Sequence, residues 1–113
     1  MIFITGPLYA GKKTYIQNAL HLTDAEFCRL AVWDVQDLAE GDLDALADRL
    51  ARRDIVIATE IGCGVIPADA EARARRERAG RLSCLLAERA DTVIRVCCGL
   101  PQLLKGTLPC SST

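Results

Sequence analysis

The sequence predicts a three-layer α/β fold, in which helices cover both faces of a small and mainly parallel sheet. Short apolar runs at residues 2–5, 54–58 and 92–98 alternate with segments of helical periodicity, and this alternation is typical of a parallel sheet. After Asp54 the second run is continuously apolar, as expected for a central strand buried on both faces. A glycine-bounded loop follows the first run, and ligands of such sheets bind beyond the carboxyl ends of the strands.

The composition indicates one globular domain over residues 1–113, with a flexible tail at 107–113. Half of the 113 residues are hydrophobic, 26% are charged, and the formal net charge is −1. This balance gives no overall attraction to nucleic acid or to an anionic membrane, so neither is expected as a partner. Without a signal peptide or an apolar run of membrane-spanning length, we expect a cytoplasmic protein.

The first half of the chain predicts two strands and one helix. Residues 2–5 form a buried strand, and about 12–20 form a helix with Ile16, Ala19 and Leu20 on one face. The segment 23–26 has the form of a capping box, although 27–33 fits a second strand better than a long helix.

The second half continues the alternation of helices and strands. Asp42 begins an amphipathic helix at 43–53 with leucines at helical spacing. The strand at 54–58 leads into a loop at 59–67 and then a long helix from about 68 to 90. The run 92–98 is the last strand that we expect.

The loop after the first strand is the strongest functional motif. It follows the phosphate-binding pattern G-x-x-x-x-G-K-[ST] up to its last position, and its residues are Gly6, Pro7, Leu8, Tyr9, Ala10, Gly11, Lys12, Lys13 and Thr14. The glycines let backbone N–H groups turn toward anionic oxygens, and the following helix adds a positive dipole end.

Two lysines stand at the end of this motif. Lys12 is placed to reach the β and γ phosphates of GTP or ATP. Lys13 occupies the position of the hydroxyl that normally holds Mg²⁺, and Thr14 comes one step late. The motif therefore predicts a phosphate cradle whose metal ligand is replaced. The alternative is a strand–turn–helix in which the glycines serve only the turn.

Two carboxylates follow apolar runs and are candidates for catalysis or metal binding. Glu60 comes after the strand at 54–58, and Asp34 comes after the run that ends at Trp33. Gly62 and Gly64 favour Glu60, because they permit close approach of a ligand to the backbone. Either carboxylate is also compatible with an ordinary polar residue at a strand end.

The helix at 68–90 is rich in arginine. One interpretation is a phosphate-recognising face; the other is a solvated face joined by Glu71–Arg75 and Glu77–Arg81 at i, i+4 spacing. The spacing favours the second interpretation for most of these arginines.

The six cysteines do not predict a metal site or a disulfide framework. They lack paired C-x₂-C spacing and an export signal, and they are Cys28, Cys63, Cys84, Cys97, Cys98 and Cys110. We expect Cys84, Cys97 and Cys98 to pack as small buried hydrophobic residues. Cys63 lies in the glycine-rich loop, where a reactive thiol is the less favoured interpretation.

Four segments of the chain resemble one family in their order. They are Thr5-Gly6 with Gly11-Lys12, the block from Thr59 to Pro67, Arg76-Glu77 with Gly80-Arg81, and the run from Val96 to Gly106. Together they resemble adenosylcobinamide kinase / adenosylcobinamide-phosphate guanylyltransferase, over residues 1–20 and about 54–106.

The resemblance implies a P-loop NTPase-like fold and a place in cobalamin (vitamin B12) nucleotide-loop assembly. It implies Mg²⁺-dependent phosphorylation of adenosylcobinamide by GTP or ATP, followed by GMP transfer through a guanylylated histidine. It also implies a homo-oligomer with sites near subunit boundaries. For such an enzyme, Lys12 and Glu60 are the expected catalytic residues, and Glu60 would hold the metal or orient the acceptor hydroxyl. The expected substrate or metal residues are Asp34, Gly62, Cys63, Gly64, Pro67, Arg76 and Arg81.

The chain also departs from the family pattern. The hydroxyl position holds Lys13, and the segment that bears the family's histidine has no counterpart; His21 is not in a matching motif. Two readings follow: a compact corrinoid-pathway kinase or nucleotidyltransferase, and a non-catalytic nucleotide- or corrinoid-binding protein that has lost the chemistry. A structural remnant without a ligand is the third alternative.

Overall fold

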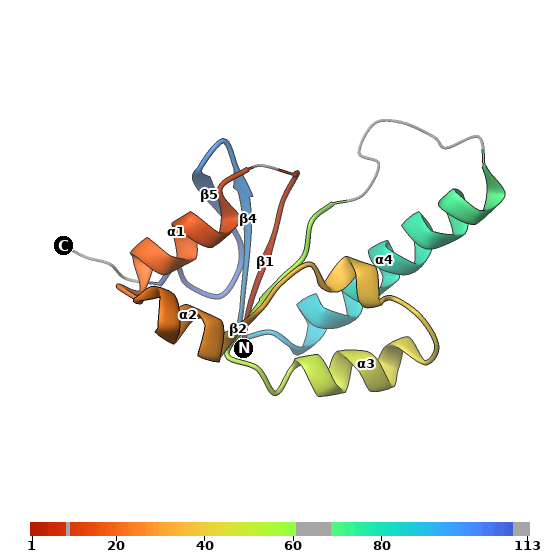
Figure 1. Ribbon diagram of the computed structural model, residues 1–113, viewed down its shortest axis with the longest axis horizontal. Helices are drawn as coiled ribbons and strands as arrows, with labels where there is room; N and C mark the ends of the chain where they lie inside the picture. The colour runs from red at the N-terminus through yellow and green to blue at the C-terminus, as the bar shows by residue number, and fades with distance from the viewer. Residues whose placement is uncertain (9, 61–68, 110–113) are drawn as a thin grey trace.

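The computed structural model describes residues 1–8, 10–60 and 69–109. Within these residues one sheet has the strand order β2-β3-β1-β4-β5 (Figure 1). Its strands are β1 (Ile2–Thr5), β2 (Ala31–Val32), β3 (Ile55–Ile57), β4 (Thr92–Cys97) and β5 (Leu100–Lys105). The first four strands are parallel, and β5 pairs antiparallel with β4. The helices are α1 (Lys12–Ala19), α2 (Asp24–Leu30), the 3₁₀ helix η1 (Val35–Leu38), α3 (Leu43–Leu50) and α4 (Ala70–Arg89).

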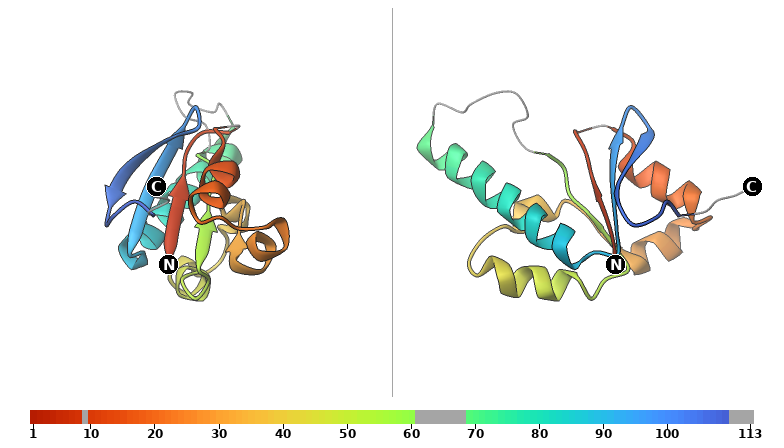
Figure 2. Two further views of the ribbon diagram at one scale, coloured as in Figure 1. Left: turned by 90° about the vertical axis from the view of Figure 1, so that its left-hand side faces the viewer. Right: turned by 180° about the vertical axis from the view of Figure 1, so that it is seen from behind.

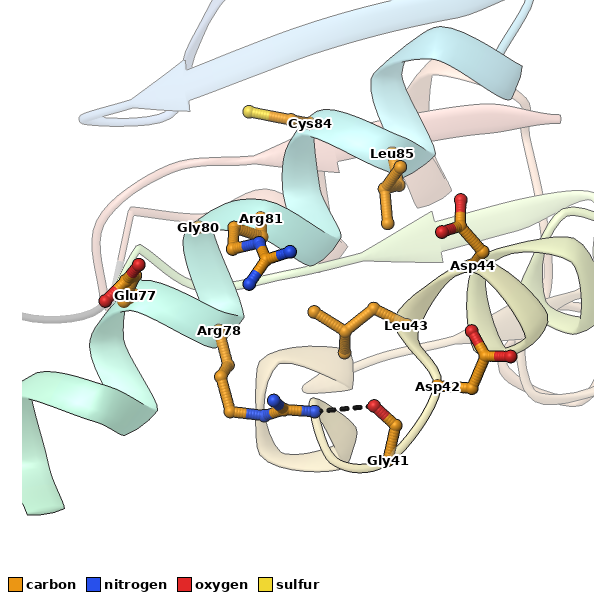
Figure 3. Close-up of a pocket in the computed structure, with 10 residues that line it drawn as sticks. All are labelled: Gly41, Asp42, Leu43, Asp44, Glu77, Arg78, Gly80, Arg81, Cys84 and Leu85. Atoms are coloured by element: carbon orange, nitrogen blue, oxygen red, sulfur yellow. Dashed lines mark hydrogen bonds between the residues drawn. The ribbon is translucent and has the colours of Figure 1, made fainter.

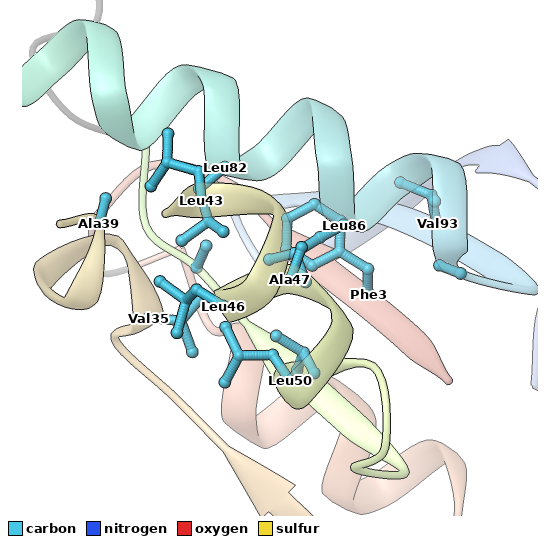
Figure 4. Packing of buried hydrophobic residues seen from close by; sticks show 13 residues of the cluster. Phe3, Val35, Ala39, Leu43, Leu46, Ala47, Leu50, Leu82, Leu86 and Val93 are labelled. Carbon is cyan, nitrogen blue, oxygen red and sulfur yellow. The ribbon is translucent and has the colours of Figure 1, made fainter. Parts of the chain in front are cut away.

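Helices cover both faces of the sheet, which confirms the predicted three-layer α/β fold. Figures 1 and 2 show α1 and α2 on one face and α3 and α4 on the other. Side chains alternate along β1, so that Phe3 packs into the core with α3 and α4 (Figure 4) while Ile4 packs toward α1 and α2. All three residues of β3 are buried, as the continuous apolar run at this position predicts.

Most expected elements form within a few residues of their predicted bounds. The described part of the long helix begins after its N-cap Asp69, whose side chain accepts a hydrogen bond from the N–H of Glu71; residue 68 lies outside the described residues. In the predicted tail, Thr107–Pro109 form neither helix nor strand, and 110–113 are not described.

The prediction of a strand over residues 27–33 is wrong for most of that range. The capping box is real: Thr23 Oγ1 accepts from the N–H of Glu26, while Glu26 Oε1 accepts from the N–H of Thr23. It begins α2, and only Ala31–Val32 pair with β3. Two satisfied backbone donors at the N-terminus outweigh the β propensity of the apolar residues that follow.

The strand β5 is not among the predicted elements. It folds back on β4 through a two-residue turn in which Cys98 (φ 54°) and Gly99 (φ 74°) both have positive φ, the geometry of a tight hairpin. Every residue of β5 is exposed, so the strand shows no alternation of buried and exposed positions.

The expected burial of Cys84, Cys97 and Cys98 is also wrong, because all three are exposed. Cys97 and Cys98 lie at the end of the β4–β5 hairpin, beyond the helices that cover β4. Leu82, Leu86 and Val96 are buried, but the nearby cysteines are not.

The expected Glu71–Arg75 and Glu77–Arg81 pairs are likewise absent from the ion pairs of the described residues. Arg89 of α4 instead forms ion pairs with Asp44 and Asp48 of α3. Fully hydrated i, i+4 pairs gain little free energy, whereas Arg89 connects two helices.

Candidate functional site

The glycine loop after β1 is held against both neighbouring strands. Gly6 has φ 150°, and a Cβ at this position would lie 2.2 Å from the carbonyl oxygen of Val96 in β4. On the other side, the carbonyl of Gly6 accepts a hydrogen bond of 2.9 Å from the N–H of Glu60, three residues after the end of β3. The absence of a side chain at Gly6 therefore permits its close approach to β4, while its carbonyl group binds the segment that follows β3.

The tip of the β4–β5 hairpin supports the far end of the same loop. The N–H of Gly99 donates a hydrogen bond of 2.8 Å to the carbonyl of Ala10. Gly11, the N-cap of α1, has φ 85°, and a Cβ here would lie 3.4 Å from the Cα of Gly99. A hairpin that sequence analysis did not find thus fixes the entry to α1.

Lys12 is buried at the first turn of α1 and lies across the loop. Its Nζ donates to the carbonyl of Pro7 at 2.7 Å and to that of Gly6 at 3.3 Å. Burial lowers the pKa of Lys12 below its usual range, and the negative charges of Asp34 and Glu60 partly oppose this effect. The ammonium group is thus placed where the sequence motif predicts phosphate binding.

A cavity of about 300 Å³ opens beside this lysine at the carboxyl ends of the parallel strands. Its lining residues come from the loop, from α1 and from the segments that follow β2 and β3. They include Leu8, Gly11, Lys12, Lys13, Thr14, Asp34 and Thr59. The structure therefore brings Asp34 to the predicted cradle.

Lys13, which lines this cavity, lies over an aromatic ring. Its Nζ is 4.4 Å from the centroid of the Trp33 ring. Trp33 in turn stacks on the buried ring of Phe27, with centroids 5.5 Å apart and planes at 22°. The aromatic pair comes from α2 and the end of β2, which sequence analysis did not connect with the cradle.

The side chain of Glu60 makes a bidentate ion pair. Arg95 Nε and Nη2 donate to the two carboxylate oxygens of Glu60 at 2.6 and 3.1 Å. Both side chains are half-buried, a setting in which a bidentate guanidinium–carboxylate pair is well ordered. Arg95 was missed from the sequence because the pairing depends on β1 lying between β3 and β4.

A second cavity, of about 310 Å³, lies at this ion pair. It is lined by Thr5, Thr59, Glu60, Arg76, Gly80 and Ser83, among others. Thr59 lines both cavities, and its N–H donates a 2.9 Å hydrogen bond to Oε1 of the buried Gln36. The two cavities therefore share one lining residue, Thr59, whose backbone is held by a hydrogen bond.

The remaining predicted site residues are not all brought together. Arg81 lines a third cavity of about 680 Å³ between α3 and α4 (Figure 3), where Arg78 Nη2 donates to the carbonyl of Gly41 at 2.7 Å. This places Arg81 apart from Arg76. The predicted residues Tyr9, Gly62, Cys63, Gly64 and Pro67 lie outside the described residues.

The donor set of the cradle does not fit Mg²⁺ well. Magnesium requires oxygen ligands in near-octahedral geometry, but the hydroxyl position of the motif holds Lys13, and the carboxylate of Glu60 is paired with Arg95. Among residues 1–8, 10–60 and 69–109, no three His, Cys, Asp or Glu side chains form a group suited to a metal ion. Of the carboxylates in the described part of the chain, Asp34 is the one that lines the first cavity.

Comparison with known proteins identifies a matching family. A family model described as cobinamide kinase / cobinamide phosphate guanyltransferase matches residues 13–104, which is most of the chain. A comparison with curated proteins gives no match. Among the residues that the structure describes, no helix is long and apolar enough to cross a membrane.

Proposed function

Since the chain belongs to the cobinamide kinase / cobinamide phosphate guanyltransferase family, we propose that it phosphorylates adenosylcobinamide with GTP or ATP. The family acts in nucleotide-loop assembly of cobalamin biosynthesis. In the proposed reaction, the hydroxyl oxygen of the corrinoid forms a bond to the γ-phosphorus. The bond from that phosphorus to the β-phosphate oxygen breaks, and the hydroxyl proton is released.

One observation carries this proposal: the cavity of the glycine loop and the cavity of Glu60 meet at Thr59. A triphosphate in the first cavity would present its γ-phosphate toward the second. The second cavity would then hold the acceptor, so that the acceptor hydroxyl and the γ-phosphate would meet beside Thr59. Holding both reactants in this way replaces a bimolecular encounter by a positioned one.

The residues of the two cavities have distinct proposed roles. Lys12 binds the phosphates and neutralises negative charge that develops during transfer, assisted by Lys13. Glu60, oriented by Arg95, positions the acceptor hydroxyl. Arg76 adds positive charge to the second cavity.

A following guanylyl transfer would require a nucleophilic histidine. His21 is the single histidine of the chain, and it is exposed and lines neither of the two cavities. We therefore assign it no role.

The second candidate is a non-catalytic nucleotide- or corrinoid-binding protein. Two observations favour it: Lys13 replaces the metal-binding hydroxyl, and the carboxylate of Glu60 is engaged by Arg95. Both cavities would still accept ligands in such a protein.

Mass spectrometry distinguishes the two candidates. The protein is incubated with adenosylcobinamide, Mg²⁺ and either ATP or GTP, beside a full-length family enzyme as positive control. We expect the phosphorylated corrinoid to appear, and the Lys12→Ala variant should not produce it. An unmodified corrinoid in the presence of a working positive control would favour the binding protein.

We also expect the protein to form a homo-oligomer. The sheet ends at β5, whose residues are all exposed and include Leu100 and Leu104, and such an edge favours association. Sedimentation equilibrium measures the oligomeric state, and a monomer at high concentration would contradict the expectation.

A further inference from the structure

We propose that Lys13, held against the ring of Trp33, is a second phosphate-binding cation that lets the cradle bind a polyphosphate without a divalent cation. The inference rests on the proposed function, because it concerns the same cavity. It starts from two observations: the cavity fits Mg²⁺ poorly, and Lys13 occupies the position of the hydroxyl that normally binds the metal.

The position of Lys13 is determined by its neighbours. It directly follows Lys12 in the first turn of α1 and lines the same cavity. Its ammonium group lies 4.4 Å from the centroid of Trp33, within the range of a cation–π interaction. A lysine held in this way loses less conformational freedom when an anion binds than a freely rotating one.

The aromatic ring that holds Lys13 is itself fixed. Trp33 is half-buried and stacks on Phe27, the buried residue of α2. The following residue, Asp34, adopts φ 56° and lines the cavity with Lys13. The residues that follow β2 thus place the carboxylate of Asp34 in the lining of the cradle cavity and the ring of Trp33 against the ammonium group of Lys13, although Trp33 itself lines a different cavity.

The charges in this cavity favour a polyphosphate and disfavour a dication. Lys12 and Lys13 contribute two positive charges, and Asp34 contributes one negative charge. A divalent cation there would meet two ammonium groups and one carboxylate, whereas a triphosphate would meet a net positive lining. A lysine cannot bridge phosphate oxygens as Mg²⁺ does, but it supplies charge and three N–H donors without a metal.

A purely structural role for the Lys13–Trp33 contact makes different predictions. If the contact only packs α1 against β2, substitution of Lys13 would change the stability of the fold. It would leave phosphate affinity and its dependence on Mg²⁺ unchanged.

Calorimetric titration separates the two roles. ATP and inorganic tripolyphosphate are titrated into the full chain, once in EDTA and once in excess Mg²⁺. For the unaltered protein we expect affinity in EDTA at least equal to affinity in Mg²⁺. Tripolyphosphate should behave like ATP, because the inference concerns the phosphates and not the base.

The key variant is Lys13→Thr, which restores the hydroxyl of the motif. We expect its affinity in EDTA to fall by about tenfold or more, as for the loss of a charge-assisted hydrogen bond, and Mg²⁺ to increase its affinity. Arg52→Thr is the matched control. It removes the same charge from an exposed position just before β3, at the amino ends of the parallel strands and so opposite to the cradle. It should leave both affinities unchanged.

Trp33 tests how Lys13 is held. Trp33→Phe keeps an aromatic face and should retain most of the affinity in EDTA, whereas Trp33→Leu should lose part of it. Thermal unfolding of each variant verifies that the fold is intact. Because Trp33 is the single tryptophan of the chain, its fluorescence in the unaltered protein should change when polyphosphate binds.

Two results would overturn the inference. If the unaltered protein binds ATP only with Mg²⁺, or if Lys13→Thr binds equally well in EDTA, Lys13 is not the second phosphate cation, although the proposed nucleotide binding stands. If neither ATP nor tripolyphosphate binds under any condition, the proposed function itself fails and this inference fails with it.

Discussion

Gly6 is the single residue on which the shape of the glycine loop depends most. Its backbone has φ 150°, and the nearest atom to an added Cβ is a main-chain oxygen of β4, which cannot move aside as a flexible side chain can. The same residue accepts the hydrogen bond from Glu60. A change at this position therefore affects both the cradle and the acceptor side of the site.

We predict that Gly6→Ala lowers the free energy of unfolding by about 1–3 kcal/mol. The clash of the added Cβ with the carbonyl oxygen of Val96 and the disfavoured φ both destabilise the native state. Urea unfolding followed by circular dichroism measures it. Gly80→Ala is the matched control: it lies inside α4, and its Cβ would meet no atom within 4 Å. There, alanine should raise the free energy of unfolding by about 0.5–1 kcal/mol. Equal effects of the two variants would contradict the account of Gly6.

The lowered pKa of Lys12 predicts a pH dependence of nucleotide affinity. Phosphate binding requires the ammonium form, and burial lowers the pKa of this group below 10.5. ATP affinity should therefore fall as the pH rises toward the pKa of Lys12, and earlier than an exposed lysine would allow. Titration between neutrality and about pH 9.5 measures this dependence. Lys12→Arg keeps its charge throughout this range and should show a flatter profile; an identical decline in both proteins would contradict the assignment to Lys12.

At the scale of secondary structure, α2 supports the aromatic ring against which Lys13 lies. Its capping box fixes where the helix begins, and Phe27 in its middle supports Trp33. The place where α2 begins therefore influences the position of Lys13, because Phe27 packs on Trp33 and Trp33 packs on Lys13.

We predict that Thr23→Ala lowers the free energy of unfolding by about 1 kcal/mol, since it leaves the N–H of Glu26 without its side-chain acceptor. Urea unfolding provides the measurement. Thr107→Ala, at an exposed position beyond β5, removes the same atoms and should have almost no effect. Equal stability of the Thr23→Ala variant and the unaltered protein would show that the box does not contribute.

The elements that sequence patterns predict well are those with strong periodicity or continuous burial. The strand β3 is apolar at each position, and α3 presents Leu43, Leu46 and Leu50 on one face. By contrast, β5 is exposed throughout and so lacks a pattern of burial. In α2 the capping signal and the β propensity of Phe27 to Trp33 favour different structures, and the hydrogen bonds of the cap prevail.

The site is predictable in part for the same reason. Asp34 and Glu60 were found because carboxylates that follow parallel strands reach one edge of the sheet. Arg95, Gln36 and Trp33 were not found, because their contacts join segments distant in sequence. A single sequence gives strand ends but not strand order, and it is the order β3-β1-β4 that places Arg95 across from Glu60.

At the scale of the whole molecule, the sheet order separates the two proposed binding regions. The first cavity lies toward α1 and β2, and the second lies under the oblique helix α4, whose N-terminal half extends away from the sheet (Figures 1 and 2). A change on α4 should therefore affect the corrinoid without affecting the nucleotide.

Ser83→Leu tests this separation. Ser83 of α4 lines the second cavity and none of the other cavities described above, so the larger side chain should narrow that cavity, and we predict that adenosylcobinamide binds at least about tenfold more weakly, the equivalent of about 1.4 kcal/mol. ATP affinity should stay the same. Equilibrium dialysis with the corrinoid and calorimetry with ATP provide the two values. Ala74→Leu, exposed on the same helix and outside the cavity, is the control, and an equal loss in both variants would contradict the assignment of the cavity.

The most direct test of the central claim is a calorimetric titration of ATP and GTP into the unaltered protein, Lys12→Ala and Arg52→Ala, each first shown to be folded by circular dichroism. The account predicts that the unaltered protein and Arg52→Ala bind at least one of the two nucleotides equally well. It predicts that Lys12→Ala binds that nucleotide about ten- to a hundredfold more weakly. Equal affinity of the Lys12→Ala variant and the unaltered protein would contradict the claim that the glycine loop is a phosphate cradle.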